Sequence, residues 1–288
     1  MKKSSSGHTA RPGDPAAKAP ALKLSECMES AAKAIVTARQ KVSKGGLHEV
    51  RVSVRRCRTI AQGLGDCASA PLYRKIDSLG KKLFRKTNPL RDAQVRIKWA
   101  GKLFRKTPSA CRTVVKELKK CERSETRRVV KALRDFPLKK WKKLAVRLAA
   151  GEGGRLSEKS LQAEAGWMAL SIRRFDRKAR KTGDPKDYHR LRISFKQYRY
   201  FAEAFFPEGE QGQDEDRLKA VQDALGEAHD LAGLAEFLSG IRGKLEKKDL
   251  ETLMTALDRQ SRASLRRYWL LHKSSPQKIR PAAPASEK

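Results

Sequence analysis

The chain has 288 residues, of which 39% are hydrophobic, and this is enough apolar material for about two domains or one duplicated unit. Its 66 Lys and Arg residues against 32 Asp and Glu residues give a formal net charge of +34. Such uncompensated charge attracts polyanions, so nucleic acid, polyphosphate and anionic membrane surfaces are the candidate partners.

No stretch approaches the ~18 consecutive apolar residues of a membrane span, and no apolar segment follows the basic start, so we expect neither a transmembrane helix nor a secretory signal. The cysteines are odd in number and include no Cys-x-x-Cys pair, which argues against a disulfide framework or a thiolate zinc site and favours a reducing cytoplasm. We interpret them as small core residues: Cys27, Cys57, Cys67, Cys111 and Cys121.

Both ends of the chain, residues 1–22 and 273–288, lack periodicity and are expected to be disordered tails. Between them nearly every segment has helical period and none alternates as a strand does, which predicts an all-α fold. Breakers divide this region into expected helices at 24–43, 47–65, 70–86, 90–106, 109–135, 139–150, 157–181, 187–206, 214–226, 229–241 and 246–271. The expected domains are an N-terminal helical bundle at 23–136, a linker with a short basic helix at 137–156, and a C-terminal bundle at 157–272.

Residues 47–58 and 188–199 carry nearly the same basic pattern, which indicates a duplication. In each copy a histidine begins a series with steps of three, four and three residues, and this spacing places the side chains on one helix face. We call these series the first ladder and the second ladder; they consist of His48, Arg51, Arg55 and Arg58, and of His189, Arg192, Lys196 and Arg199. An apolar stripe about 100° around each helix should face a core.

A second motif extends the repeat, because Lys81-x-Leu83…Leu90-Arg91-Asp92 aligns with Lys219-x-Val221…Ala228-His229-Asp230. Helices joined by short loops pack antiparallel, so we expect two homologous antiparallel bundles related by pseudo-twofold symmetry. The ladders would then meet at a basic central cleft or channel. We interpret Asp92 and Asp230 as structural residues, each of which either caps a helix start or orients an arginine.

These sequences resemble the paired motifs of the CHAD family, the conserved histidine α-helical domain: His48-x-x-Arg51-x-x-x-Arg55-Arg56-x-Arg58, His189-x-x-Arg192-x-x-x-Lys196-x-x-Arg199-Tyr200, and the downstream pairs Arg91-Asp92 and His229-Asp230. The resemblance spans about residues 24–271. It implies two helical bundles whose basic central channel binds inorganic polyphosphate. We expect a cytoplasmic protein, and association with polyphosphate granules is one expectation for its location. Gln197 stands where the first copy has Arg56, so the second half should contribute less charge there.

The predicted polyphosphate site consists of the ladder cations and of basic residues beside them or in the second motif: His48, Arg51, Arg55, Arg56, Arg58, Lys81, Lys82, Arg85, Lys86, Arg91, His189, Arg192, Lys196, Arg199 and Lys219. Polyphosphate offers repeated negative charge without bases, and arginine, lysine and histidine supply the donors that it needs. We expect no cofactor, no metal and no catalytic residue. Because a bound polyanion favours protonated His48 and His189, binding should strengthen at mildly acid pH.

Two other functions stay open. A nucleic-acid-binding protein also fits the net charge, if only as secondary non-specific binding, but no zinc finger, RNA-recognition or helix-turn-helix signature occurs. The aromatic residues lie mostly on core stripes, although Lys139 to Lys143 around Trp141 form a candidate nucleic-acid or membrane-surface patch. A phosphotransfer or polyphosphate-cleaving enzyme would use His48 or His189 as nucleophile, yet the chain has no Gly-rich phosphate loop and no suitably spaced carboxylate cluster.

Overall fold

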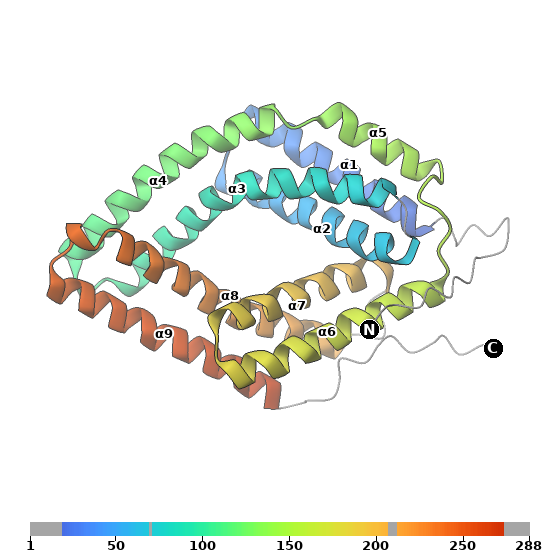
Figure 1. Cartoon of the computed structure of the whole chain (residues 1–288). Helices are drawn as coiled ribbons and strands as arrows, with labels where there is room; N and C mark the ends of the chain where they lie inside the picture. Colours follow the sequence, from blue (N-terminus) through green and yellow to red (C-terminus); the bar gives the residue numbers. More distant parts are fainter. Residues whose placement is uncertain (1–18, 69–70, 207–211, 274–288) are drawn as a thin grey trace.

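The computed structural model describes residues 19–68, 71–206 and 212–273, and within these ranges it contains helices and no strand (Figure 1). The helices are α1 (Ala19–Gln40), α2 (Lys44–Ala68), α3 (Pro71–Leu103), α4 (Pro108–Arg134), α5 (Leu138–Ala149), α6 (Glu158–Thr182), α7 (Pro185–Phe205), α8 (Gly212–Gly240) and α9 (Lys247–Lys273), with a 3₁₀ turn at Arg242–Lys244. The all-α prediction is confirmed. Most of both predicted tails lies outside the described residues.

The turn between α6 and α7 shows how the sequence sets a helix boundary. Gly183 ends α6 in the left-handed conformation with φ of 65°, which glycine adopts without steric cost. Asp184 then caps α7, because its side chain accepts a hydrogen bond of 2.8 Å from the backbone N–H of Lys186. Pro185 occupies the first turn, where its missing N–H costs nothing. This short turn makes α6 and α7 an antiparallel pair and fixes the start of the second ladder.

The predicted breaks at Asn88-Pro89 and near Gly226 are wrong, because α3 and α8 each run through them. Pro89 lies inside α3 and cannot donate to the carbonyl of Arg85. The helix continues because its buried stripe does: Leu83 and Leu90, on either side of the break, are 2% and 1% exposed. Tertiary packing thus outweighs the local cost of proline.

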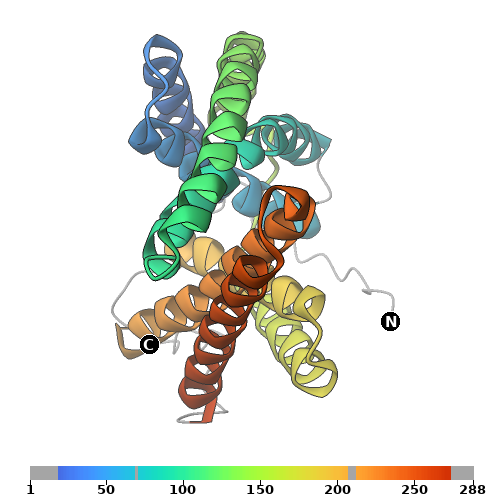
Figure 2. The ribbon, with the colours of Figure 1, turned by 90° about the vertical axis from the view of Figure 1, so that its left-hand side faces the viewer.

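The core has two parts. The larger cluster takes residues from every α-helix, and mainly from α1, α2, α3, α5, α6 and α7. Its largest fully buried side chain is Trp141, whose Nε1 donates a 2.9 Å hydrogen bond to the carbonyl of Met28. The smaller cluster joins α3, α4, α8 and α9, and Figure 2 views the molecule from that end. Cys57 is fully buried, as predicted, whereas Cys121 is exposed on α4, so the core interpretation is wrong for that cysteine.

Helices of the two predicted halves pack together at the centre of the molecule: α2 contacts α7, and α3 contacts α8. The two helices that carry the ladders therefore lie against each other.

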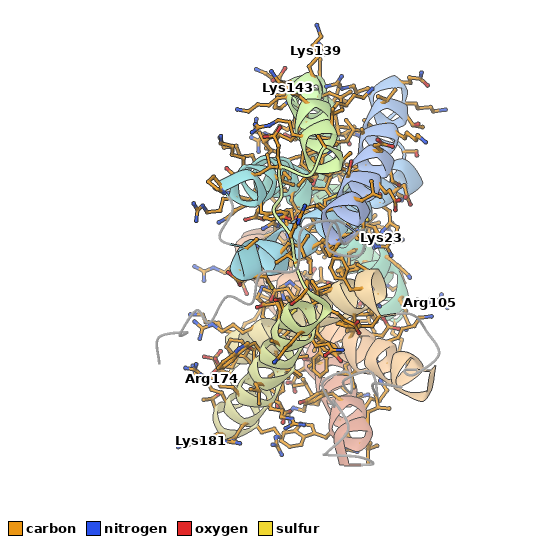
Figure 3. The ribbon with its side chains drawn as sticks, turned by 90° about the vertical axis from the view of Figure 1, so that its right-hand side faces the viewer. Lys23, Arg105, Lys139, Lys143, Arg174 and Lys181 are labelled. Carbon is orange, nitrogen blue, oxygen red and sulfur yellow. The ribbon has the colours of Figure 1, made fainter. Side chains whose placement is uncertain are left out.

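Among the described helices, none is both long and apolar enough to cross a bilayer. Cations cover both outer ends of the molecule, with Lys139 and Lys143 on α5 at one end and Arg174 and Lys181 on α6 toward the other (Figure 3).

Candidate functional site

One aromatic ring organises the first ladder. The guanidinium carbons of Arg51, Arg55 and Arg58 lie 4.4, 4.9 and 5.7 Å from the centre of the Phe84 ring. Three guanidinium groups on one helix would otherwise repel each other, and the negative face of the ring on α3 attracts all three. Phe84 was not predicted from the sequence as a site residue, although it follows the predicted cations Lys81 and Lys82 in the second motif.

Hydrogen bonds and a glycine fix two of these arginines further. Arg51 is 8% exposed, and its Nη1 donates a 2.6 Å hydrogen bond to Oδ1 of Asn88. Arg58 forms a 2.8 Å ion pair with Asp77 through Nε. A methyl group at Gly80 would lie 2.6 Å from Cγ of Arg58, so the glycine leaves room for the arginine stem between α2 and α3. Both ends of the three-arginine stack are thus anchored to α3.

Replacing Phe84 with Leu should destabilise the protein by about 1.5 to 3 kcal/mol, since three cation–π contacts of about 0.5 to 1 kcal/mol each are lost while leucine keeps part of the packing. Urea unfolding followed by circular dichroism measures this change. Phe175→Leu on α6 is the matched control, because that ring is also partly buried against the core. Equal losses in the two variants would show that Phe84 acts only through packing.

Among the described residues no single aromatic ring organises the second ladder: of its Arg and Lys side chains only Arg199 lies over a ring, with its guanidinium carbon 5.1 Å from the centre of the Tyr200 ring. Arg192 packs over Gly226 of α8, where a methyl group would lie 3.5 Å from its Nε, and this buried Nε has no hydrogen-bond partner among the described residues. Lys196 is partly buried. Burial, reinforced by Arg192 and Arg55, lowers the pKa of Lys196 to about 6. At pH 7 Lys196 is therefore mostly neutral in the unliganded protein, although it lies among cations.

The two ladders lie close enough to perturb each other. Burial is the largest cause of the lowered pKa values of Arg192 and Lys196, and Arg55 of the first ladder lowers both further. In the reverse direction, burial and Arg55 lower the pKa of Arg51 to about 10, and Arg192 contributes to that shift. These mutual effects define a group of ladder cations at the α2–α7 contact: Arg51, Arg55, Arg192 and Lys196. We call it the central cation cluster.

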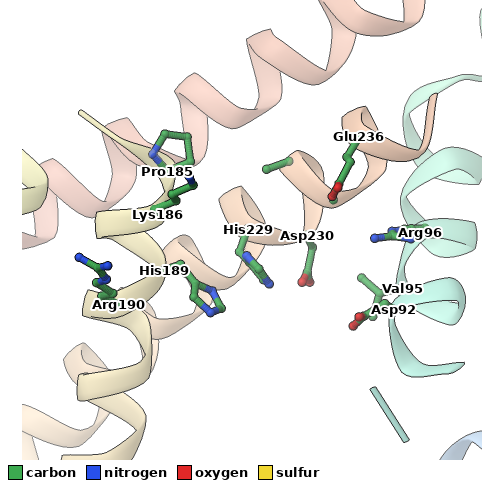
Figure 4. A pocket seen from close by; sticks show the side chains of 12 residues that line it. Asp92, Val95, Arg96, Pro185, Lys186, His189, Arg190, His229, Asp230 and Glu236 are labelled. Carbon is green, nitrogen blue, oxygen red and sulfur yellow. The ribbon is translucent and has the colours of Figure 1, made fainter. Parts of the chain in front are cut away.

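A pocket of about 580 Å³ opens beside this cluster between α3, α7 and α8 (Figure 4). The rings of His189 and His229 lie in it with their centres 4.4 Å apart and their planes at 35°. Loss of surrounding water, followed by the charge of Arg192, lowers the pKa of both histidines, that of His229 to about 4. The remaining walls are formed by Asp92, Val95, Arg96, Pro185, Lys186, Arg190, Asp230, Ala232, Gly233 and Glu236.

His229 and Arg96 are pocket residues that were not among the predicted site residues. The signal for His229 is visible in the aligned second motifs, where it stands in the place of Arg91. Arg96 shows no repeat signal; its guanidinium crosses from α3 to α8 and packs over Gly233, where a methyl group would lie 3.3 Å from its Nη2. Glycine in α8 therefore permits a contact between the two halves that only the tertiary structure reveals.

Asp92 and Asp230 lie in the middle of α3 and α8, so the interpretation that they cap helix starts is wrong. Burial raises the pKa of both carboxyl groups, and Arg192 acts against this rise at each of them. The two carboxylates thus approach the same arginine from different helices. Both lie within electrostatic range of the central cation cluster, which they neutralise only in part.

The other predicted site residues are distributed more widely. Arg56 and Arg199 each lie 3.0 Å from a carboxylate oxygen of Glu203, which therefore bridges α2 and α7. Arg91 is half-buried and acts electrostatically on Arg51. On α3, Lys81 and Arg85 share a face with Asn88, while Lys82 and Lys86 are turned about 100° further round. Exposed side chains complete the set: His48, Lys81, Lys82, Arg85, Lys86 and Lys219.

No group of three or more His, Cys, Asp or Glu side chains suited to a metal ion occurs in the part of the chain that the structure describes. The described residues form an all-helical protein in which several cations lie close together where α2 and α7 meet. The family model of the CHAD domain matches residues 24–239, and the chain therefore belongs to the CHAD domain family.

Solved structures support the fold assignment. PptA from Streptomyces chartreusis superimposes with a TM-score of 0.73 at 13% sequence identity, over 90% of this chain and 100% of that one. The CHAD domain from the plant Ricinus communis superimposes with a TM-score of 0.69 at 21% identity, over 96% of this chain and 99% of that one. A search of the curated proteins found no match.

Proposed function

We propose that the protein binds inorganic polyphosphate, without cleaving it, through the central cation cluster and the ladder residues around it. Membership of the CHAD family supports this role at the level of the family. The observation that carries the proposal for this chain is the uncompensated charge of the cluster. Burial and the charge of Arg55 lower the pKa values of its other three members, Arg51, Arg192 and Lys196, and the Nε of Arg192 is buried without an acceptor among the described residues.

A bound polyanion would directly reduce the electrostatic repulsion among these cations. Each phosphate supplies several acceptor oxygens and negative charge, so it can pair with a guanidinium fork and restore the proton of Lys196. Asp92 and Asp230 supply at most two negative charges, against the three arginines and one lysine of the cluster, so they cannot compensate it in full. The cluster is therefore better suited to an anionic ligand than to remaining empty.

Two features favour polyphosphate over nucleic acid as the ligand of this site. The Phe84 ring already faces three guanidinium groups, which makes it a poor platform for stacking a base. Trp141, the aromatic residue at the centre of the basic Lys139–Lys143 segment, is fully buried. The cations at both places can attract phosphate, but the aromatic surface that single-stranded nucleic acid requires is occupied.

The test is calorimetric titration at physiological salt with long-chain polyphosphate, duplex DNA and single-stranded RNA. We expect tight binding of polyphosphate and much weaker binding of the other two. Equal binding of all three, lost together as salt rises, would contradict a specific site, because counterion release by net charge alone behaves in that way. Incubation with polyphosphate and Mg²⁺ should leave the chain length unchanged; shortened products would contradict a purely binding role.

A further inference from the structure

The outer face of α6 combines exposed apolar side chains with cations in a single line. Its inner face packs on α7 and α2 through buried residues: Leu161, Ala165, Ala169, Ile172 and Ala179. The opposite side carries five residues at alternating steps of three and four, the spacing that keeps side chains on one helix face. We call them the α6 stripe: Trp167, Leu170, Arg174, Arg177 and Lys181. At 1.5 Å per residue the stripe is roughly 20 Å long.

All five members of the α6 stripe are exposed, and the two apolar ones are half-exposed, Trp167 at 49% and Leu170 at 51%. Trp167 is the most exposed of the four tryptophans. Within α6, which the structure describes in full, the acidic residues beyond the first turn are buried on the other side. Asp176 is 5% exposed and pairs with Arg180 and Tyr268, and Glu164 is 7% exposed. The charge of the stripe is therefore uncompensated on its own face.

The basic helix α5 lacks this combination. Its tryptophan, Trp141, is in the core, where it contacts Phe136 with ring centres 5.6 Å apart. The exposed aliphatic side chain near its lysines is Val146, which is 67% exposed but smaller than an aromatic ring. The membrane-surface patch suggested by the sequence at Lys139 to Lys143 therefore has cations without an exposed aromatic anchor, whereas the α6 stripe has both.

We propose that the α6 stripe is a docking surface for an anionic lipid bilayer. Tryptophan prefers the boundary between headgroups and acyl chains, because its ring is apolar and its N–H still needs a polar partner. Arginine and lysine bury their stems there while their charged ends reach the lipid phosphates. A polyphosphate chain would use the three cations but would gain nothing from Trp167 and Leu170. A bilayer uses all five residues, and charge complementarity selects an anionic one.

Geometry separates this surface from the central cation cluster. The cluster lies where α7 meets α2, whereas the stripe points away from α7 on the far side of α6. In Figure 3, Arg174 and Lys181 are at the periphery, at the opposite end of the molecule from Lys139 and Lys143. These two lysines therefore provide a control with the same change in net charge.

The test is co-sedimentation with vesicles made of equal parts phosphatidylcholine and phosphatidylglycerol. The variant Arg174→Gln with Arg177→Gln should bind roughly 25-fold more weakly than the unmodified protein, because each cation close to an anionic surface contributes about fivefold. The variant Lys139→Gln with Lys143→Gln should bind within about twofold of the unmodified protein, since these charges lie more than a Debye length from the docked bilayer. Equal losses in the two variants would overturn the proposal in favour of net charge.

A second readout reports on Trp167 itself. Vesicles that contain brominated phosphatidylcholine should quench tryptophan emission of the unmodified protein, and Trp167→Phe should remove this quenching. Quenching that persists in Trp167→Phe would overturn the proposal, because another tryptophan would then face the lipid. An emission change from Trp167 on addition of poly-glutamate, without one on addition of vesicles, would also overturn it and would indicate an acidic protein partner.

Discussion

Reversing one charge in each ladder, as in Arg51→Glu combined with Arg192→Glu, should abolish tight polyphosphate binding. Each change removes a cation from the central cation cluster and places an anion beside the ligand. Hydrogen bonds to charged groups contribute about 1.5 to 3 kcal/mol each, so the loss of two should weaken binding by roughly 100-fold or more, before repulsion is included. Calorimetry with long-chain polyphosphate measures the effect. Circular dichroism should show that the double variant keeps the helix content of the unmodified protein.

Two controls make this result specific. Lys139→Glu combined with Lys143→Glu changes the net charge equally on the exposed face of α5, and should reduce affinity by less than about tenfold at physiological salt. Because Arg51 also bonds to Asn88, the single variant Arg192→Glu provides a second measurement in which that contact stays intact. If the α5 variant loses as much affinity as the ladder variant, the ladders are not the site.

The helices could be predicted from the sequence because their apolar residues recur with helical period, and the ladders because identical spacing appears twice. The sequence did not correctly predict where the helices are interrupted. Proline at position 89 is a local signal for a break, but the chain is held in one helix by Leu83 and Leu90, whose burial depends on α2 and on the rest of the core. Because α3 and α8 are continuous, Asp92 and Asp230 lie in the middle of these helices and not at the helix starts that the sequence predicts.

The cations of the site could be predicted from the sequence, but the contacts that they make with other side chains could not. Spacing identifies Arg51, Arg55 and Arg58 as neighbours, but it does not reveal that one Phe84 ring faces all three. His229 meets His189 only because α7 and α8 pack together. The ordinary pKa of histidine predicts a pH dependence that comes from His48 and His189. The lowered pKa of Lys196, in contrast, follows from its burial and its neighbours, which only the folded structure reveals.

Lys196 should couple polyphosphate binding to proton uptake. Burial and the charges of Arg192 and Arg55 lower its pKa in the unliganded protein from the ordinary 10.5 to about 6. A bound polyanion favours the charged form and raises this pKa. Affinity should therefore increase as pH falls from the pKa of the complex toward about 6, by up to tenfold per pH unit, and Lys196 should contribute no further increase below about pH 6. His229, whose pKa is lowered to about 4, should extend the increase at more acid pH.

Calorimetry at about pH 8 in buffers of different ionisation enthalpy measures this proton uptake, since Lys196 is then mostly neutral in the unliganded protein and charged in the complex. Lys196→Arg keeps a cation that stays protonated in both states, so it should bind polyphosphate with close to one proton fewer taken up. Lys219→Arg on the exposed surface is the matched control and should leave proton uptake unchanged. If Lys196→Arg takes up as many protons as the unmodified protein, Lys196 gains no proton when polyphosphate binds, and this coupling of binding to proton uptake is wrong.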